Sequence, residues 1–385
     1  MAQKKKTGHI KPDERLEKRP EKKTNYDKIK ELEQELSTTK YNKRTEHAIG
    51  LIKARIANLK KKELARSASK GKKEGYSVRK TGDGTVIILG FPSVGKSTLL
   101  NSITNADSLI GTYDFTTLNV IPGIMDYEHA KIQILDVPGV VSGAASGRGR
   151  GKEVLAVIRN CDLVIILLDI NQLNTYNVLC KELYEAGICL NQEKLDVRIK
   201  KKARGGIQIG KTVPLPNLDD ETIKGILKEF SISNAEILIR TPINADQLID
   251  CIEGNRKYLP GIVIVNKIDL ATPEQIDDAK KKFPDALFIC AKKEDYTDEL
   301  KEKIYKGLEL INIYLKEVGK KADLEIPLVM NKDCTIRNVC SRLHQDFITK
   351  FKYARVWGNS AKFGGQMLRL KHKLSDGDVV ELHLG

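Results

Sequence analysis

Hydrophobic positions near the N-terminus recur at helical spacing. Apolar residues return every three to four positions at Ile29, Leu32 and Leu36, and the same spacing returns between residues 49 and 59. This periodicity predicts two amphipathic helices. The polar stretch 37–45 separates them, so we expect an antiparallel helical hairpin.

Uninterrupted apolar runs mark a different element type further along the chain. Residues 85–89, 163–168 and 261–265 are β-branched or apolar throughout, which is typical of buried parallel strands. Residues 131–135 add a further strand. These runs predict an α/β fold. About 90 residues separate the second run from the third, more than one crossover connection needs, so we expect an inserted α+β domain at 171–255.

Within that insertion, residues 195–209 alternate between apolar and polar positions around a basic Arg-Gly-Gly turn at 204–206. The alternation predicts a β-hairpin. Its basic face has two interpretations, an RNA contact or a solvated surface. Because charge runs are usually solvated, the solvated surface is the favoured interpretation.

The pattern changes again near residue 314. Strand-like runs at 324–329, 352–357 and 379–384 surround a helical period at 335–347. A strand, a helix and further strands in so short a segment predict a small α+β module.

Charge is concentrated at one end of the chain. The net charge of the 385 residues is +15, and residues 1–80 hold 25 of the 66 Lys and Arg but 11 of the 51 Asp and Glu. The rest of the chain is nearly neutral. Residues 1–24 are Lys-rich with few apolar side chains, which predicts a disordered basic tail. Such an arm suits RNA, and the alternative is a solvated tail.

The composition also bears on the compartment. The chain contains no run of 18 apolar residues, and its N-terminus lacks an apolar signal segment. We therefore expect neither a membrane span nor a membrane partner. The seven cysteines are scattered and form no CxxC pair. We interpret them as reduced core residues of a cytoplasmic protein.

A phosphate-binding motif directly follows the first predicted strand. Gly90 to Ser97 match G-x-x-x-x-G-K-[ST] with a strand before and a helix after, the context in which this motif binds a nucleoside triphosphate. Lys96 is expected to reach the β- and γ-phosphates, and the Ser97 hydroxyl to bind Mg²⁺. The predicted nucleotide-contacting residues of this segment are Gly90, Phe91, Pro92, Ser93, Val94, Gly95, Lys96, Ser97 and Thr98.

Two later segments fit the γ-phosphate and the metal. Asp136 ends a predicted strand and suits the second metal-positioning group, and Gly139 offers its N–H to the γ-phosphate. A polar loop at 111–118 contains adjacent threonines, either of which could add its hydroxyl to the metal shell. The predicted nucleotide-contacting residues here are Phe115, Thr116, Thr117, Leu118, Asp136, Val137, Pro138 and Gly139.

A third motif favours guanine over adenine. Asn266, Lys267, Ile268 and Asp269 directly follow the third apolar run. A carboxylate at Asp269 accepts hydrogen bonds from guanine N1–H and its exocyclic amine, a donor pair that adenine lacks. Asn266 can complement guanine O6 and N7, and the Lys267 stem can pack on the base. A further predicted strand ends in the segment expected to place backbone N–H groups near O6, namely Cys290, Ala291 and Lys292.

Together these motifs resemble one family. GFPSVGKSTLLN, YDFTTL, DVPG, GAASGRGRGKEVL and NKID are similar to segments of the developmentally regulated GTP-binding (DRG) proteins, within the Obg-type translation-factor GTPases. The resemblance implies a Ras-like P-loop GTPase core, an N-terminal helical hairpin, an inserted ribosomal-protein-like domain and a C-terminal ubiquitin-like (β-grasp) TGS domain. The expected domains are a tail at 1–24, a hairpin and linker at 25–83, a GTPase domain at 84–170 and 256–313, the insertion at 171–255, and the TGS domain at 314–385.

The resemblance also implies an activity. It predicts a Mg²⁺-dependent GTPase switch on translating ribosomes, in contact with ribosomal RNA and a DRG-family regulatory protein, with no DNA partner. It makes Thr117 rather than Thr116 the metal-sensing threonine. The implied catalytic residues are Lys96, Thr117 and Gly139, and the implied metal ligands are Ser97, Thr117 and Asp136. The alternative is a nucleotide-regulated RNA-binding scaffold with negligible turnover.

Two positions depart from relatives of this class. Val140 occupies the position where Ras-like enzymes carry a water-orienting glutamine, and valine cannot hydrogen-bond water, so we expect slow intrinsic hydrolysis that a partner, the ribosome or a monovalent cation accelerates. Relatives that use K⁺ tend to carry asparagine where this chain has Ser93, so K⁺ is an open alternative.

Overall fold

The structure is a computed structural model that describes residues 24–40, 42, 45–69, 82–104, 121–137, 151–293 and 295–385. The chain divides into two compact units. Unit 1 comprises residues 1–73 and 195–254, and unit 2 comprises residues 74–194 and 255–385. Each unit is therefore built from two separate stretches of chain.

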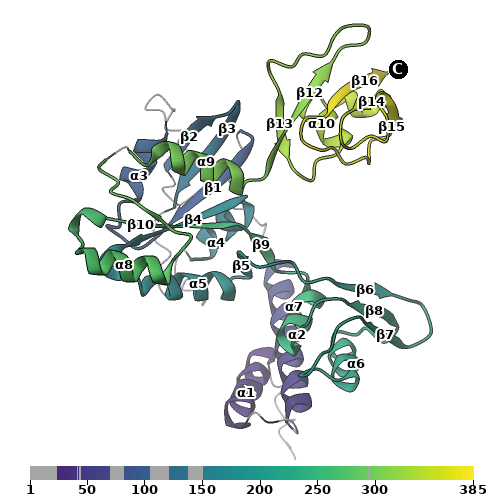
Figure 1. Cartoon of the computed structure of the whole chain (residues 1–385). Coiled ribbons are helices and arrows are strands. Elements are labelled where there is room, and N and C mark those ends of the chain that lie inside the picture. The colour runs from purple at the N-terminus through teal and green to yellow at the C-terminus, as the bar shows by residue number, and fades with distance from the viewer. Residues whose placement is uncertain are drawn as a thin grey trace, which may run out of the picture. The chain divides into compact units, whose positions relative to one another are not determined.

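Unit 2 contains the α/β core (Figure 1). Its six-stranded sheet has the order β11-β10-β4-β1-β3-β2, in which β2 pairs antiparallel with β3 and the other neighbours pair in parallel. The strands are β1 (Gly84–Leu89), β2 (Ile121–Tyr127), β3 (Ala130–Asp136), β4 (Leu163–Asp169), β10 (Gly261–Asn266) and β11 (Leu287–Phe288). All residues of β1 and β4 are buried, as their apolar runs predict.

Helices cover both faces of this sheet. Alternate residues of β1 belong to different cores, since Val86 packs with α3 and α9 whereas Ile87 packs with α4 and α5. This two-sided burial explains why the strands are continuously apolar rather than alternating. The helices and 3₁₀ turns of this region are α3 (Lys96–Ile103), α4 (Gly151–Asn160), η1 (Ile170–Gln172), α5 (Thr175–Glu185), η2 (Ile268–Leu270), α8 (Pro273–Lys282) and α9 (Thr297–Gly307).

Register brings several strand ends together. Ile88 of β1 lies opposite Asp136 of β3, and Asn266 of β10 lies opposite Asp169 of β4. The loop that follows β1 therefore emerges beside the polar ends of β3, β4 and β10. Ligands of open parallel sheets bind at this carboxyl edge.

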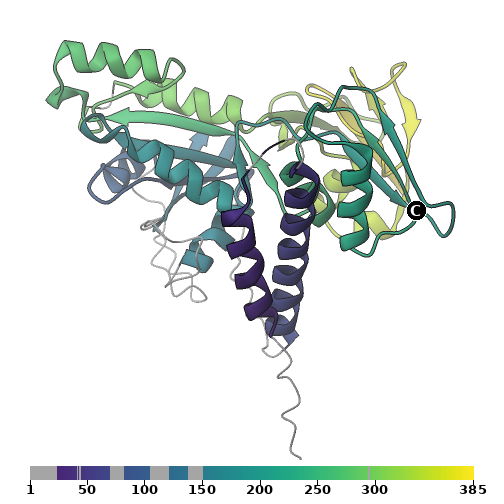
Figure 2. The ribbon, with the colours of Figure 1, turned by 90° about the horizontal axis from the view of Figure 1, so that it is seen from below.

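Unit 1 joins the N-terminal helices to the inserted segment. Its elements are α1 (Asn25–Thr38), α2 (Glu46–Ser69), β6 (Val197–Lys201), β7 (Ile207–Lys211), α6 (Asp220–Glu229), β8 (Ala235–Ile239) and α7 (Ala245–Glu253). The pair α1 and α2 is visible side by side in Figure 2, and the contacts Asn25–Glu63 and Glu33–Lys60 give it an antiparallel direction. Ala54 of α2 is fully buried in one core with residues of α6, α7 and β8.

Two features of the insertion differ from the sequence-based expectation. The predicted hairpin at 195–209 is wrong, because β6 and β7 both pair with β8, which lies between them in the order β6-β8-β7. The compact unit also starts at Leu195 rather than at residue 171. Residues of α5 and of β5 (Ile188–Leu190) pack in the core of the α/β sheet, and β5 pairs with β9 (Lys257–Leu259).

The C-terminal module contains a five-stranded mixed sheet and a short helix. The strand order is β13-β12-β16-β14-β15, and β12 runs parallel to β16. Residues of α10 pack on one face of this sheet, which gives the β-grasp arrangement. The elements are β12 (Leu310–Lys316), β13 (Leu328–Asn331), α10 (Ile336–Leu343), α11 (Asp346–Thr349), β14 (Phe351–Trp357), β15 (Gln366–Leu368) and β16 (Val379–Leu384).

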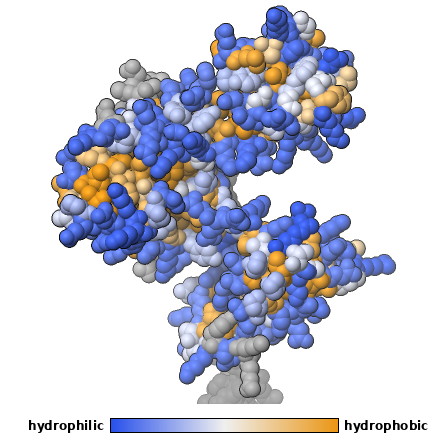
Figure 3. All heavy atoms as spheres, in the orientation of Figure 1, coloured by the Kyte–Doolittle hydropathy of each residue, from blue (hydrophilic) through white to orange (hydrophobic). Residues whose placement is uncertain are grey.

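The visible surface of unit 2 is mixed. Figure 3 shows hydrophobic side chains gathered near the carboxyl end of β10, among hydrophilic ones. All seven cysteines are free, and five of them are buried. Within the described ranges, no helix is long and apolar enough to span a bilayer.

Candidate nucleotide-binding site

The loop between β1 and α3 has the backbone that a phosphate cradle needs. Ser93 and Gly95 have positive φ angles of 64° and 99°. A Cβ at Gly95 would lie 2.5 Å from Asn266 Nδ2, so glycine is required both by its φ and by this close approach. The helix α3 begins at Lys96, and its N-terminus therefore opens directly onto the loop.

Lys96 folds over the same loop. Its Nζ donates to the carbonyl oxygens of Gly90 and Phe91, both at 3.1 Å. Burial lowers the pKa of this lysine, and the nearby Asp136 carboxylate partly opposes that effect. A half-buried ammonium held by two carbonyls is poised to exchange them for a stronger anionic partner.

Ser97 and Asp136 meet across the sheet edge. The Ser97 hydroxyl donates to Asp136 Oδ2 at 2.9 Å. The other carboxylate oxygen, Oδ1, is buried and has no hydrogen-bond partner among the described residues. A buried oxygen without a partner beside a hydroxyl fits the hard oxygen ligands that Mg²⁺ prefers, with phosphates completing the shell. The predicted ligands Ser97 and Asp136 are thus adjacent.

Asn266 connects two loops. Its side chain is buried; Nδ2 donates to the Val94 carbonyl at 2.8 Å, and Oδ1 accepts from the Ala291 N–H at 2.9 Å. The asparagine therefore fixes the phosphate loop against the segment 290–292. A positioning role for Asn266 was not evident from the sequence, and its contact with guanine stays a prediction.

Lys267 has an ion-pair partner that the sequence did not predict. Its backbone has a positive φ of 64°, and its Nζ lies 2.8 Å from Asp169 Oδ2. Burial alone would raise the pKa of Asp169, but hydrogen bonds from Lys267 and from the Asn171 N–H lower it below its usual value. The sequence signal for this contact was that the apolar runs at 163–168 and 261–265 are each followed directly by polar residues.

We expect Asp169→Asn to lower the free energy of unfolding by about 1 kcal/mol at neutral pH. A carboxylate with a lowered pKa stabilises the fold above its unfolded pKa of about 4, and this contribution is lost as the pH falls through the folded value. Urea titrations should therefore show a constant difference from the parent chain between about pH 5 and 8 that shrinks below about pH 4. Asp278→Asn, in a pair whose members are both 79% exposed, is the control and should change nothing. A pH-independent loss would contradict the assignment.

Asp269 lies in η2, and its side chain is exposed. An exposed carboxylate is accessible to the guanine base of a nucleotide. It lines a cavity of about 420 Å³ together with Ile268 and Cys290. A second cavity of about 470 Å³ is lined by Ser97, Thr98, Asn101, Ser102, Ala291 and Lys292. Asn101 and Ser102 are lining residues that the motifs did not indicate.

Some of the remaining predicted site residues lie within the described ranges and others lie outside them. Val94 is buried, Phe91 packs against both cores of the sheet, and Pro92 is exposed. Val137 is buried at the end of β3. Several predicted residues lie outside the described ranges, and their roles stay predictions: Phe115, Thr116, Thr117, Leu118, Pro138, Gly139 and Val140.

Known families match the chain from residue 85 onward. A family described as 50S ribosome-binding GTPase matches residues 85–201, the C-terminal region of the same domain matches 204–310, and the TGS domain matches 311–384. The predicted P-loop GTPase core and C-terminal TGS domain are confirmed. The match boundaries place α5 in the GTPase region, as its packing does.

Individual relatives agree over most of their length. The chain is 49% identical to a GTP-binding protein of Methanocaldococcus jannaschii over 92% of both chains. It is 42% identical to developmentally-regulated G-protein 3 of Arabidopsis thaliana and 40% identical to human developmentally-regulated GTP-binding protein 2, covering 92% of this chain and 97% and 98% of theirs. Among solved structures, the Schizosaccharomyces pombe YchF GTPase is 14% identical with a TM-score of 0.41, over 79% of this chain and 99% of that one. The chain therefore belongs to the developmentally regulated GTP-binding protein family and is a GTP-binding protein with a GTPase domain.

Proposed function

We propose that this chain is a Mg²⁺-dependent, cytoplasmic GTPase switch that acts on translating ribosomes. The observation that carries the nucleotide part is the meeting of three motifs at one sheet edge. Ser97 contacts Asp136, and Asn266 joins the phosphate loop to the segment 290–292. These contacts support one site in which a single nucleotide meets the predicted phosphate, metal and base residues.

Each residue has a distinct task in this proposal. Lys96 leaves the carbonyls of Gly90 and Phe91 and neutralises charge on the β- and γ-phosphates. Ser97 and Asp136, with Thr117, would hold Mg²⁺, which would supply neutralisation of the charge that develops on the phosphates. Asp269 selects guanine, and Lys267, oriented by Asp169, packs its stem against the base. The Gly139 N–H contacts the γ-phosphate, so its segment responds to hydrolysis.

Turnover is proposed to be slow until a partner is present. Val140 supplies no hydrogen bond to the attacking water, so a group from the ribosome, from a DRG-family regulatory protein or from a monovalent cation must orient it. K⁺ is retained as one option although Ser93 replaces the asparagine of K⁺-using relatives. Hydrolysis in K⁺ against Na⁺ buffers separates this option from the others.

The ribosomal part rests on the description of the matching GTPase family and on the basic charge of residues 1–80. We expect ribosomes to raise single-turnover GTP hydrolysis at least tenfold, measured as phosphate release with ribosomes, without them, and with ribosomes digested by nuclease. Stimulation by intact ribosomes alone supports the switch. No stimulation by ribosomes or by the regulatory partner would leave the scaffold with negligible turnover as the better account.

A further inference from the structure

Within the described residues of unit 1, no helix shares a core with the outer face of its sheet. On the inner face, Ile237 and Ile239 of β8 are fully buried, and α2, α6 and α7 share their core. Along β6 and β8 the intervening residues point the other way and are largely exposed, as at Arg198, Lys200 and Glu236. The sheet thus has a buried face and an outer, polar one.

The outer face and its adjoining turn are strongly basic. Residues 196–212 and 235–240, which contain the three strands, include seven Lys or Arg and two acidic residues. Lys201 and Lys211 have the register of the buried face, and Lys211 pairs with Asp220 of α6, which leaves five cations on the outer face and its turn. Glu236 is paired with Lys202 at 2.9 Å, and the other acid is Asp196. Arg204, in the adjoining turn, forms no ion pair with any described residue. The excess positive charge is therefore available to an anionic partner.

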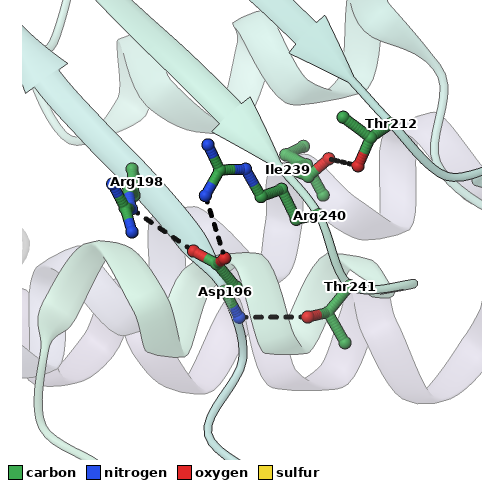
Figure 4. Close-up of polar contacts among 6 residues, drawn as sticks. All are labelled: Asp196, Arg198, Thr212, Ile239, Arg240 and Thr241. Atoms are coloured by element: carbon green, nitrogen blue, oxygen red, sulfur yellow. Dashed lines mark hydrogen bonds and ion pairs between the residues drawn. The ribbon is translucent and has the colours of Figure 1, made fainter.

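Asp196 arranges two arginines from different strands. It is fixed by its own N–H, which donates to Thr241 Oγ1 at 3.0 Å. Its carboxylate lies 3.4 Å from Arg198 Nε and 3.4 Å from Arg240 Nη1 (Figure 4). One carboxylate cannot neutralise two guanidinium groups, and each arginine keeps terminal nitrogens for another acceptor. Arg198 and Arg240 are 70% and 42% exposed, so a phosphate can reach both.

The composition of this surface favours contacts to the phosphate backbone of a nucleic acid over contacts to its bases. The strands β6, β7 and β8 and the turn 202–206 contain no aromatic residue, so no ring is available on which unpaired bases could stack. Gly205 and Gly206 have positive φ and open space where a Cβ would be, which lets a helical backbone approach the turn closely. Positive side chains without aromatic rings are typical of surfaces that contact the phosphates of double-helical RNA.

We propose that the outer face of the sheet β6-β8-β7 binds the phosphodiester backbone of double-helical RNA. Arg198 and Arg240, arranged by Asp196, donate to phosphate oxygens, and Lys200 and Arg204 extend the contact along the duplex. This inference rests on the ribosomal part of the proposed function and assigns it a surface. Binding of RNA at this surface does not require bound GTP.

The test is binding of the full-length chain to a short labelled RNA duplex, measured by fluorescence anisotropy over a series of salt concentrations. Arg198→Glu with Arg240→Glu should weaken binding at least tenfold and reduce the slope of log affinity against log salt by about 2. The matched control is Lys224→Glu with Lys228→Glu, which makes the same charge change on exposed positions of α6 in the same unit. All proteins keep the N-terminal arm, so its contribution is common to them.

The control should bind nearly as the parent chain does. Equal losses in both double variants would show that only net charge matters, and would overturn the assignment, as would unchanged binding or a preference for anionic vesicles over the duplex. If the glutamate variant fails to fold, Arg198→Gln with Arg240→Gln gives a smaller loss in the same direction. Because duplex binding is measured without nucleotide or ribosomes, its failure is distinguishable from a failure of ribosome-stimulated hydrolysis.

Discussion

The Lys96→Ala variant is expected to lose GTP hydrolysis by a factor of about 10³ or more, with GTP binding reduced beyond easy measurement. Its ammonium is the cation that the loop between β1 and α3 holds ready beside Gly90 and Phe91. Neither the loop N–H groups nor Ser97 can replace a full positive charge. The measurement is binding of a fluorescent GTP analogue together with phosphate release.

The same substitution should leave the fold intact. Burial already lowers the pKa of Lys96, so its charge is held at a cost to stability, and alanine removes that cost. Urea unfolding without nucleotide should therefore show a free energy equal to or above that of the parent chain. Lys181→Ala, at an exposed position on α5, is the control and should retain activity. GTP binding that survives in Lys96→Ala would exclude this loop as the phosphate site.

The Asp269→Asn variant is expected to bind GTP about 10²- to 10⁴-fold more weakly. The amide offers N–H groups where guanine N1–H and the exocyclic amine need an acceptor, so two charge-assisted hydrogen bonds are lost. Xanthosine triphosphate presents a carbonyl in place of that amine, and the variant should bind it more tightly than the parent chain does. Competition with a fluorescent nucleotide measures both affinities.

Its control is Asp277→Asn, an exposed aspartate on α8 that lines neither described cavity. The control should keep the preference for GTP. If Asp269→Asn also left nucleotide preference unchanged, the guanine assignment would fail, and an ATP-dependent enzyme would become the alternative.

The nucleotide core was predictable because its signals are local. A buried strand, a glycine-lined loop and a helix occupy consecutive residues at 84–103, and the sequence shows each of them. The strand β10 likewise lies at its expected place, because a continuous apolar run is typical of a parallel strand that is buried on both faces. What local patterns omit is the partner of each residue. Asn266 approaches Gly95 from a strand far along the chain, and Asp169 meets Lys267 through register.

The same reason explains the wrong hairpin. Alternation at 197–201 and 207–211 correctly indicates two strands but says nothing about what lies between them. The intervening strand β8 begins more than 20 residues later. In the C-terminal module, the helix predicted over 335–347 ends at Leu343, because His344 adopts an extended backbone. The strand expected from residue 324 starts at Leu328, after Pro327, and the preceding Ile326 is exposed.

The construction of unit 1 from two distant stretches sets a problem of timing during synthesis. The fully buried Ala54 of α2 leaves the ribosome before the residues at 195–254 that share its core. At a synthesis rate of about 5–20 residues per second, the helix waits roughly 10–40 s until the last residue of its core has been made. During that interval its apolar stripe must be shielded by α1 or by a chaperone. Unit 1 is therefore expected to complete its fold only after the first four strands of the α/β sheet have been made.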